Sequence, residues 1–316
     1  MNNFNSKIAV QLIGAIVIFC SCHMTPKKFT DETPTRGTIK IAVDESYQLM
    51  AEAELFTFQS IYKDAKVTPM YLSGDSILNL FLADSINVII SSTKLTDNQL
   101  DYLKGKTIFP RTTKIAYDAI AFIVNKSNPD SLIRYNTLKD IFTGKTTKWN
   151  QINSKSKSDN IKVVFDNSGS NNVKTIMSKF ELTGSLPSYC YSANKNSEVV
   201  NFVQSHPEAI GLISVNWISD PRDSISHSFL SKIKVVSITP QFDSEGADFY
   251  TPHPAYIANQ MYPFTREVYM INRETFAGLG SGFTSFVAGD SGQRIILKMG
   301  MLPAAQPVRL VEIKKN

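Results

Sequence analysis

The sequence contains few cysteines and histidines, which limits the metal and disulfide chemistry that it can support. Its 316 residues include three cysteines (Cys20, Cys22 and Cys190) and four histidines. The histidines are scattered, and no Cys/His pair has the spacing of a metal-ligand motif. Cys190 stands alone beyond the first 22 residues and cannot form an internal disulfide. We therefore expect no metal site, no cofactor, and a fold held together by its core.

The sequence also lacks a strong excess of charge of either sign. Lys and Arg number 33 against 28 for Asp and Glu, a net charge of +5, and no dense basic run occurs. Such a balance favours an anionic ligand slightly but does not indicate a nucleic-acid partner. With 42% hydrophobic residues, the chain is long enough to form two lobes, each with its own core.

The longest apolar run of the N-terminal region is too short for a comfortable membrane span. Lys7 precedes an apolar stretch, Ile8 to Phe19, of the length found in signal peptides. The stretch ends in Cys20-Ser21-Cys22, which resembles the processing site of a bacterial lipoprotein. Cys22 is the better acceptor of lipid, because the small Ser21 precedes it whereas Phe19 precedes Cys20. An uncleaved anchor and a secretory signal with incidental cysteines are the alternatives.

This interpretation predicts a targeting segment followed by a spacer. Residues 1–22 form the lipoprotein signal peptide, and residues 23–36 form a polar tether that contains Pro26 and Pro34. We expect a protein of the bacterial cell envelope that is anchored by lipid and faces the periplasm.

From Gly37 onward, strand-like runs alternate with helical patterns, which predicts an α/β fold with mainly parallel sheet. Long strand-like runs at 115–125 and 262–271 are long enough to pass from one lobe to another. Residues 132–142 and 282–300 have helical patterns, whereas 221–231 and 242–254 are typical of loops.

The segment Asp166-Asn167-Ser168-Gly169-Ser170-Asn171-Asn172 lies between a β-branched run and a helical pattern. A small, hydroxyl-rich loop at a helix start presents free backbone N–H groups and the positive end of the helix dipole. Ser168 and Ser170 add hydroxyls, and Gly169 allows an anion to approach the backbone. The segment therefore predicts an oxyanion cradle, although an ordinary helix cap would have the same sequence.

Three other strand ends carry hydroxyl groups of the same kind. Ser46 follows the run Ile39–Val43, Ser73 and Gly74 follow Val67–Leu72, and Ser91 and Ser92 follow Val88–Ile90. Ligands of α/β sheets bind at the carboxyl ends of strands. The repetition predicts that these groups share one polar pocket.

Several phrases, taken in order, resemble the phosphate-binding proteins of bacterial phosphate ABC importers. The resemblance covers about residue 37 to about residue 305. The phrases that carry it are Asp118–Asn125, Leu138–Gly144 with Trp149, Ala209-Ile210-Gly211, Tyr262–Arg266, and Ser291-Gly292-Gln293 with Gly300 and Pro303. The resemblance implies the two-lobed periplasmic binding protein fold, with a central mixed, mainly parallel sheet in each lobe and a hinged cleft. It also implies a solute-binding lipoprotein, not an enzyme, that passes phosphate to an ABC permease.

The resemblance implies a site and lobe boundaries as well. Lobe I comprises 37–119 and 265–316, lobe II comprises 120–264, and hinges lie near 119–124 and 265–269. The ligand-binding residues carried over are Ser46, Ser73, Gly74, Ser91, Ser92, Ser168, Gly169 and Ser170. The protein is expected to act as a monomer.

Two departures from the family pattern concern the charge of the site. Val164 stands where many members have arginine, and Lys94 or Arg111 are candidates to replace that charge. Many members also have an aspartate at the third strand end, where this chain has Ser91-Ser92-Thr93; Asp75 and Asp166 are substitutes by location. A missing arginine removes a bidentate, charge-assisted contact.

These departures leave other functions open. The same fold could bind another oxyanion or an organic solute, or act as an envelope sensor or interaction module. A hydrolase with Ser168 as nucleophile is disfavoured, because Asp166 and Ser170 replace the glycines of a G-x-S-x-G elbow and no histidine lies in a recognisable motif.

Overall fold

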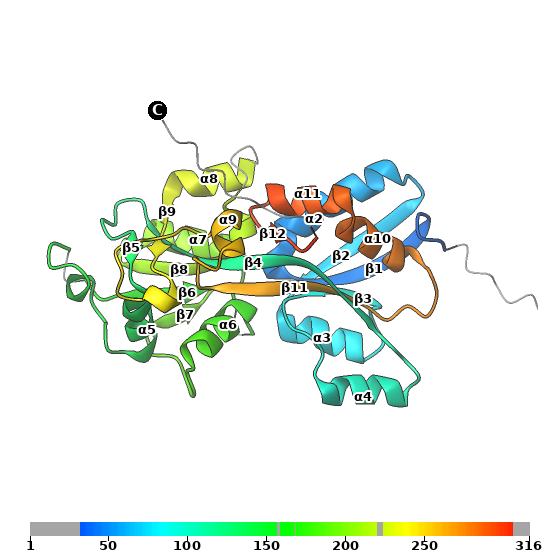
Figure 1. Cartoon of the computed structure of the whole chain (residues 1–316), viewed down its shortest axis with the longest axis horizontal. Helices are drawn as coiled ribbons and strands as arrows, with labels where there is room; N and C mark the ends of the chain where they lie inside the picture. The colour runs from blue at the N-terminus through cyan, green and yellow to red at the C-terminus, as the bar shows by residue number, and fades with distance from the viewer. Residues whose placement is uncertain (1–31, 157–158, 168, 220–223, 306–316) are drawn as a thin grey trace, which may run out of the picture. The chain divides into compact units, whose positions relative to one another are not determined.

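The computed structural model describes residues 32–156, 159–167, 169–219 and 224–305 (Figure 1). The chain divides into two compact units, 1–31 and 32–316, and everything described lies in the second. A chain that begins at Thr30 therefore keeps every described contact. Lys7, Cys20 and Cys22 lie outside the described residues, as does Ser168.

The strands form one mixed sheet in the order β2-β1-β3-β11-β4-β8-β6-β7, with β12 and β9 also pairing with β4. The strands of its first part are β1 (Gly37–Asp44), β2 (Ala65–Leu72), β3 (Val88–Ser91), β11 (Thr265–Asn272) and β12 (Leu302–Pro303). Those of its second part are β6 (Lys162–Phe165), β7 (Cys190–Ser192), β8 (Ala209–Ser214) and β9 (Ile233–Val235). A separate parallel pair is formed by β5 (Leu132–Ile133) and β10 (Ser237–Ile238).

The long strand β4 (Arg111–Asn125) joins the two parts of the sheet. Its first half pairs antiparallel with β11 and β12, and its second half pairs antiparallel with β8 and β9. On either side of this strand the outer strands are parallel, since β1 pairs with β2 and β3, and β6 pairs with β7 and β8. The predicted α/β class is confirmed, and the antiparallel pairs are those made by the crossing strands.

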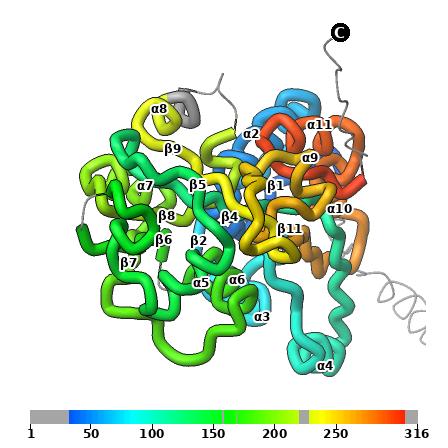
Figure 2. Tube along the Cα trace, turned by 60° about the vertical axis from the view of Figure 1, so that its left-hand side comes forward, coloured from blue at the N-terminus to red at the C-terminus, as the bar shows by residue number. Residues whose placement is uncertain are grey.

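Helices cover both faces of each part of the sheet (Figures 1 and 2). In the first part, α2 (Gln48–Ile61), α10 (Leu279–Ala288) and α11 (Asp290–Lys298) lie on one face, and α3 (Gly74–Leu82) and α4 (Asp97–Gly105) lie on the other. The second part carries α5 (Tyr135–Thr143), α6 (Asn171–Phe180), α7 (Asn196–Ser205), α8 (Ser224–Lys232) and α9 (Pro254–Ala258). Single turns of 3-10 helix are η1 (Glu45–Tyr47), η2 (Trp149–Gln151), η3 (Val215–Trp217) and η4 (Gln241–Asp243).

Three expectations about local structure are wrong. The pattern of 282–300 is not one helix, because the chain is extended at Gly289 and separates α10 from α11. Residues 224–231 are helical rather than a loop. Leu132 and Ile133 pair with β10, so helix α5 begins only at Tyr135 and ends at Gly144, whose φ of 81° favours glycine.

An aromatic cluster fixes the entry of β11. Phe264 is fully buried and packs against the rings of Phe122, Phe180 and Tyr135, with centroids 4.9, 5.3 and 5.5 Å away. The hydroxyl of Tyr262 donates to the Ile120 carbonyl oxygen at 2.7 Å. These contacts hold the start of β11 against β4 and thereby place the residue that follows, Arg266.

Candidate anion-binding site

The end of β1 meets the start of α6, although the two lie 127 residues apart in the chain. The buried carboxylate of Asp44 accepts one hydrogen bond from the Ser46 backbone N–H (3.0 Å) and another from Asn171 Nδ2 (2.6 Å). The first bond caps the turn η1, and the second ties that turn to the loop before α6.

The other predicted strand ends meet the same loop. A Cβ on Gly74 would lie 2.2 Å from Asn171 Nδ2, and a Cβ on Gly169 would lie 3.5 Å from Ser73 Oγ. Thr93 donates from its hydroxyl to Asn171 Oδ1 at 3.3 Å. The ends of β1 and β3 and the starts of α3 and α6 therefore come together.

Most of the predicted hydroxyl groups already have local partners. Ser170 caps α6 by accepting from the backbone N–H groups of Asn172 and Val173, and its hydroxyl donates to Asp166. Ser91 Oγ accepts from the Thr93 backbone, and Ser73 Oγ lies 2.9 Å from Ser76 Oγ. Ser92 is half-buried and lies beside the phenol of Tyr47. Ser46 differs, because its buried Oγ has no hydrogen-bond partner among the described residues.

The site contains an arginine that sequence reasoning missed. Arg266 of β11 lies opposite Asp118 of β4 in the strand register. Its Nε donates to Asp118 Oδ2 at 2.9 Å, and its Nη2 lies 2.8 Å from the same oxygen. Its guanidinium carbon lies 5.2 Å from the centre of the Tyr47 ring. Ser214 donates to the second carboxylate oxygen of Asp118 at 2.7 Å, which fixes the pair.

Several buried polar atoms around this arginine lack hydrogen-bond partners among the described residues. They are Nη1 of Arg266, Oγ of Ser46, both amide atoms of Asn172, and Oδ1 of Asn196. An unpaired buried polar group is costly, so a group of them points to an absent partner. We call this set, together with the carboxyl groups of Asp44, Glu45, Asp118 and Asp166, the polar cluster.

Two carboxyl groups of the polar cluster, those of Glu45 and Asp166, are harder to ionise than usual. Burial raises the pKa of Glu45 to about 7, although hydrogen bonds from the amide and backbone of Asn196 oppose this. Burial likewise raises the pKa of Asp166 to about 6, with a smaller contribution from Asp44. Protonation of these groups reduces the negative charge around Arg266 and makes them hydrogen-bond donors.

The residues considered as replacements for the missing arginine lie elsewhere. Lys94 is exposed and pairs with Glu267 at 3.7 Å, and Arg111 donates to Ser281 and to the Glu274 carbonyl oxygen. The positive charge comes instead from Arg266, on the neighbouring crossing strand. Asp75 is exposed and pairs with Lys174, whereas Asp166 is fully buried in the polar cluster.

A second set of bonds ties η1 to the end of β8. The carbonyl oxygen of Ser46 accepts from Asn216 Nδ2 at 2.7 Å and from the indole Nε1 of Trp217 at 3.0 Å. Asn216 Oδ1 accepts from the Met50 backbone at 3.4 Å. The loop that follows β1 is therefore bound to both α6 and η3.

Comparison with known families identifies the fold. The sequence model of the PBP superfamily domain matches residues 30–291. The chain belongs to this family. The expected periplasmic binding protein fold is thus confirmed, and the matched residues of this PBP-superfamily chain include every residue of the polar cluster.

Curated relatives are phosphate-binding proteins. The Phosphate-binding protein PstS of Staphylococcus epidermidis is 23% identical over 297 residues, which cover 90% of this chain and 85% of the relative. That of Staphylococcus aureus is 25% identical over 244 residues, covering 73% of this chain and 68% of the relative. The resemblance noted in the sequence is confirmed.

Solved structures of similar fold come from the same class. A phosphate ABC transporter substrate-binding protein of Clostridium perfringens, solved with bound phosphate, has a TM-score of 0.70 at 21% identity and covers 85% of this chain and 100% of its own. An ABC-type phosphate transport receptor of Vibrio cholerae has a TM-score of 0.61 at 19% identity, with coverages of 84% and 100%. At these identities the likeness supports the two-lobed fold.

Proposed function

We propose that this PBP-superfamily chain captures phosphate at the polar cluster and delivers it to an ABC importer, without chemical change. The buried guanidinium of Arg266 carries the proposal, because its Nη1 has no partner among the described residues and Ser46 and Asn172 supply further unpaired polar atoms. An oxyanion would satisfy these donors together, and a buried arginine binds phosphate strongly through its planar fork. The names of the curated relatives support the same ligand.

The carboxyl groups favour phosphate over sulfate. A phosphate that keeps a proton can donate a hydrogen bond to an ionised carboxylate, whereas sulfate has no proton to donate at neutral pH. The raised pKa values of Glu45 and Asp166 let these groups donate in turn. We expect phosphate affinity to increase as the pH falls from 8 to 6, because both carboxyl groups then gain protons.

Isothermal calorimetry on the chain beginning at Thr30 tests this function. Phosphate should give saturable heat with one site per molecule, and sulfate should give none. Absence of heat and of a thermal shift with phosphate would reject the proposal.

A different solute is the second candidate, motivated by Val164 and by the engagement of Asp44 and Glu45 with Asn171 and Asn196. A thermal-shift panel of phosphate, sulfate, molybdate and organic phosphates distinguishes the two. A shift with phosphate alone removes this candidate.

We also infer that the body has the two lobes given above, 37–119 with 265–316 and 120–264, and that they close on the ligand about β4 and β11. Bonds between these segments support the inference, among them Asp44 with Asn171 and Lys174 with Asp75. Closure about a pair of strands is a common movement of binding proteins.

Attachment to the membrane through lipid on Cys22 completes the proposal. No helix among the described residues is both long and apolar enough to cross a bilayer. In cells, Cys22→Ser should move the protein from the membrane fraction to the soluble fraction, whereas Cys20→Ser should not. The reverse result would place the lipid on Cys20.

A further inference from the structure

The two crossing strands separate the polar cluster from a hollow on their other face. Neighbouring residues of a strand point to opposite faces. Asp118 and Arg266 lie on the side of the polar cluster, whereas their neighbours Tyr117 and Thr265 line the hollow. A ligand in the hollow therefore would not contact the polar cluster directly.

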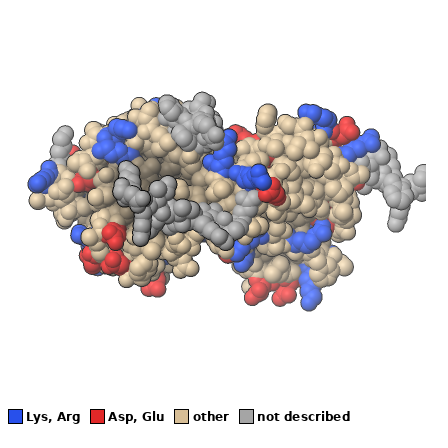
Figure 3. Space-filling view, turned by 45° about the horizontal axis from the view of Figure 1, so that its top comes forward, with Lys and Arg blue, Asp and Glu red and all other residues tan. Residues whose placement is uncertain are grey.

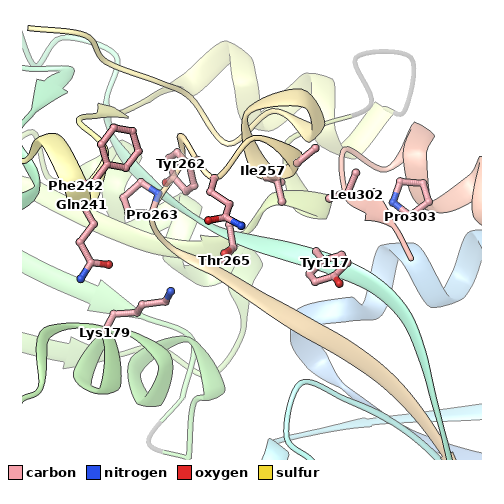
Figure 4. A pocket seen from close by; sticks show the side chains of 12 residues that line it. Tyr117, Lys179, Gln241, Phe242, Ile257, Tyr262, Pro263, Thr265, Leu302 and Pro303 are labelled. Atoms are coloured by element: carbon pink, nitrogen blue, oxygen red, sulfur yellow. The ribbon is translucent and has the colours of Figure 1, made fainter. Parts of the chain in front are cut away.

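The hollow has a volume of about 900 Å³ and gathers segments that are far apart in sequence (Figure 4). The residues that line it come from α6, η4, α9, the starts of β11 and β12, and the middle of β4. Its volume is within the range of pockets that bind small organic molecules.

The lining mixes apolar and polar side chains and carries one positive charge. Phe242, which is 74% exposed, and Leu302 supply apolar surface beside the buried Ile257 and Tyr262. Gln241, Gln260 and Thr265 supply polar groups. The single ionisable cation is Lys179, at the end of α6, and no carboxyl group lines the hollow. Figure 4 shows the side chain of Lys179 extending from α6 below Gln241 into the hollow.

Lys179 has no compensating anion among the described residues. Its side chain is partly buried, and this burial lowers the pKa of its ammonium group. No described carboxylate forms an ion pair with it, in contrast to Lys162, which pairs with Glu208 at 2.7 Å. A partly desolvated cation near the exposed ring of Phe242 suits an anion attached to an apolar body.

We propose that this hollow is a second binding site, for an organic anion that carries one carboxylate or sulfonate group on an apolar body. The acidic group pairs with Lys179, and the apolar body covers Phe242, Ile257 and Leu302. Because no carboxylate faces the hollow, amphipathic cations and neutral compounds bind less well.

The position of the hollow gives this site a consequence for phosphate. Lys179 and Phe242 belong to the predicted lobe II, and Tyr117 and Leu302 to lobe I, so the hollow changes in width when the lobes rotate. A ligand that fits one arrangement must change the affinity for phosphate, and phosphate must change its affinity by the same factor. This coupling, unlike the binding itself, rests on the proposed function.

The test uses 8-anilinonaphthalene-1-sulfonate, a fluorescent sulfonate with an apolar body, and the chain beginning at Thr30. We expect saturable binding at one site, displaced by decanoate and not by decylammonium. Lys179→Met and Phe242→Ala should each weaken it at least about fivefold, and the exposed Lys104→Met should leave it unchanged.

Equal binding by the wild type and Lys179→Met, or binding that does not saturate, would overturn the proposal. Calorimetry with phosphate on Lys179→Met should show retained binding, which also establishes that the variant is folded. If the sulfonate binds through Lys179 while phosphate gives no heat, the second site stands and the phosphate function fails. If the sulfonate and phosphate both bind, the change in sulfonate affinity on adding phosphate measures the coupling between the two sites. An unchanged affinity would reject the coupling.

Discussion

Arg266 has an environment that only a bound anion would complete. Two nitrogens of its guanidinium, Nε and Nη2, contact Asp118, and Nη1 has no partner within the described residues. We propose that Arg266 supplies the positive charge that Val164 cannot. The residue is therefore expected to determine affinity more than any of the serines.

Replacing Arg266 tests this expectation. Removing the arginine alone would leave Asp118 buried and unpaired, which is strongly destabilising. The double variant Asp118→Asn/Arg266→Met avoids this charge, and we expect it to weaken phosphate binding by roughly 1.5–3 kcal/mol, or about one to two decades in affinity, by calorimetry. Arg111→Met, on the exposed end of β4, should bind as the wild type does. A double variant that folds and binds normally would exclude Arg266 from the site.

Glu54 is a second residue whose surroundings conflict with its charge. Both carboxylate oxygens are buried without a partner among the described residues, and burial raises its pKa to about 9 from 4.5. In the unfolded chain the group ionises above pH 4.5, whereas in the fold it keeps its proton until about pH 9. The free energy of unfolding should therefore fall as the pH rises across this range.

Glu54→Met should remove this part of the pH dependence and stabilise the fold by about 1–3 kcal/mol at pH 8. Urea denaturation at pH 5 and pH 8 measures both effects, with the exposed Glu52→Met as the matched control. An equal loss of stability between the two pH values in wild type and Glu54→Met would contradict the assignment.

At the scale of elements, helix α7 packs on strand β8 through a glycine. A Cβ on Gly211 would lie 2.8 Å from Val203 Cγ2 and 2.9 Å from Val199 Cγ1, both on α7, and 2.9 Å from Ile123 Cγ1 on β4. The small residue lets the helix approach the sheet closely.

Gly211→Ala should therefore destabilise the protein by about 1–3 kcal/mol, because the helix or the strand must move. Gly105→Ala, at the end of α4 where a Cβ meets nothing within 4 Å, should cost nothing. Thermal denaturation compares the stabilities of the two variants. Equal stability would show that α7 can move away from β8 at little cost.

The elements could be predicted from sequence better than the contacts between them. Strand runs such as Val88–Ile90 have a local signal, and the structure confirms them. The break at Gly289 was missed because Phe286, Val287 and Ile295 continue an apolar pattern through it. The role of Arg266 was missed because its partner lies 148 residues away, and only the alternation along two paired strands places them together.

At the scale of the whole body, phosphate is expected to reduce the distance between the proposed lobes. Fluorescence energy transfer between labels on Asp101→Cys in α4 and Asn201→Cys in α7 should increase with phosphate and not with sulfate. Cys190 will react slowly with the labels, because burial raises its pKa to about 12. Saturation with phosphate without a change in transfer would reject closure.

The distribution of charge on the surface of the protein is that of a solute-binding protein rather than of a nucleic-acid-binding protein. Figure 3 shows Lys and Arg spread over the face in view, with Asp and Glu among them. A binder of polyanions needs its basic groups gathered in one field. The charge proposed to bind the solute is instead the buried guanidinium of Arg266.

The indole of Trp217 gives the protein an intrinsic optical reporter. Its N–H donates to the carbonyl oxygen of Ser46, whereas that of the other tryptophan, Trp149, donates to the Glu208 carbonyl oxygen in a different part of the molecule. A solute that pulls the turn η1 toward itself must alter the polarity around the indole of Trp217. The indole of Trp149 is left as an internal standard. The emission spectrum of unlabelled protein can therefore follow occupancy in real time, in stopped flow as well as at equilibrium.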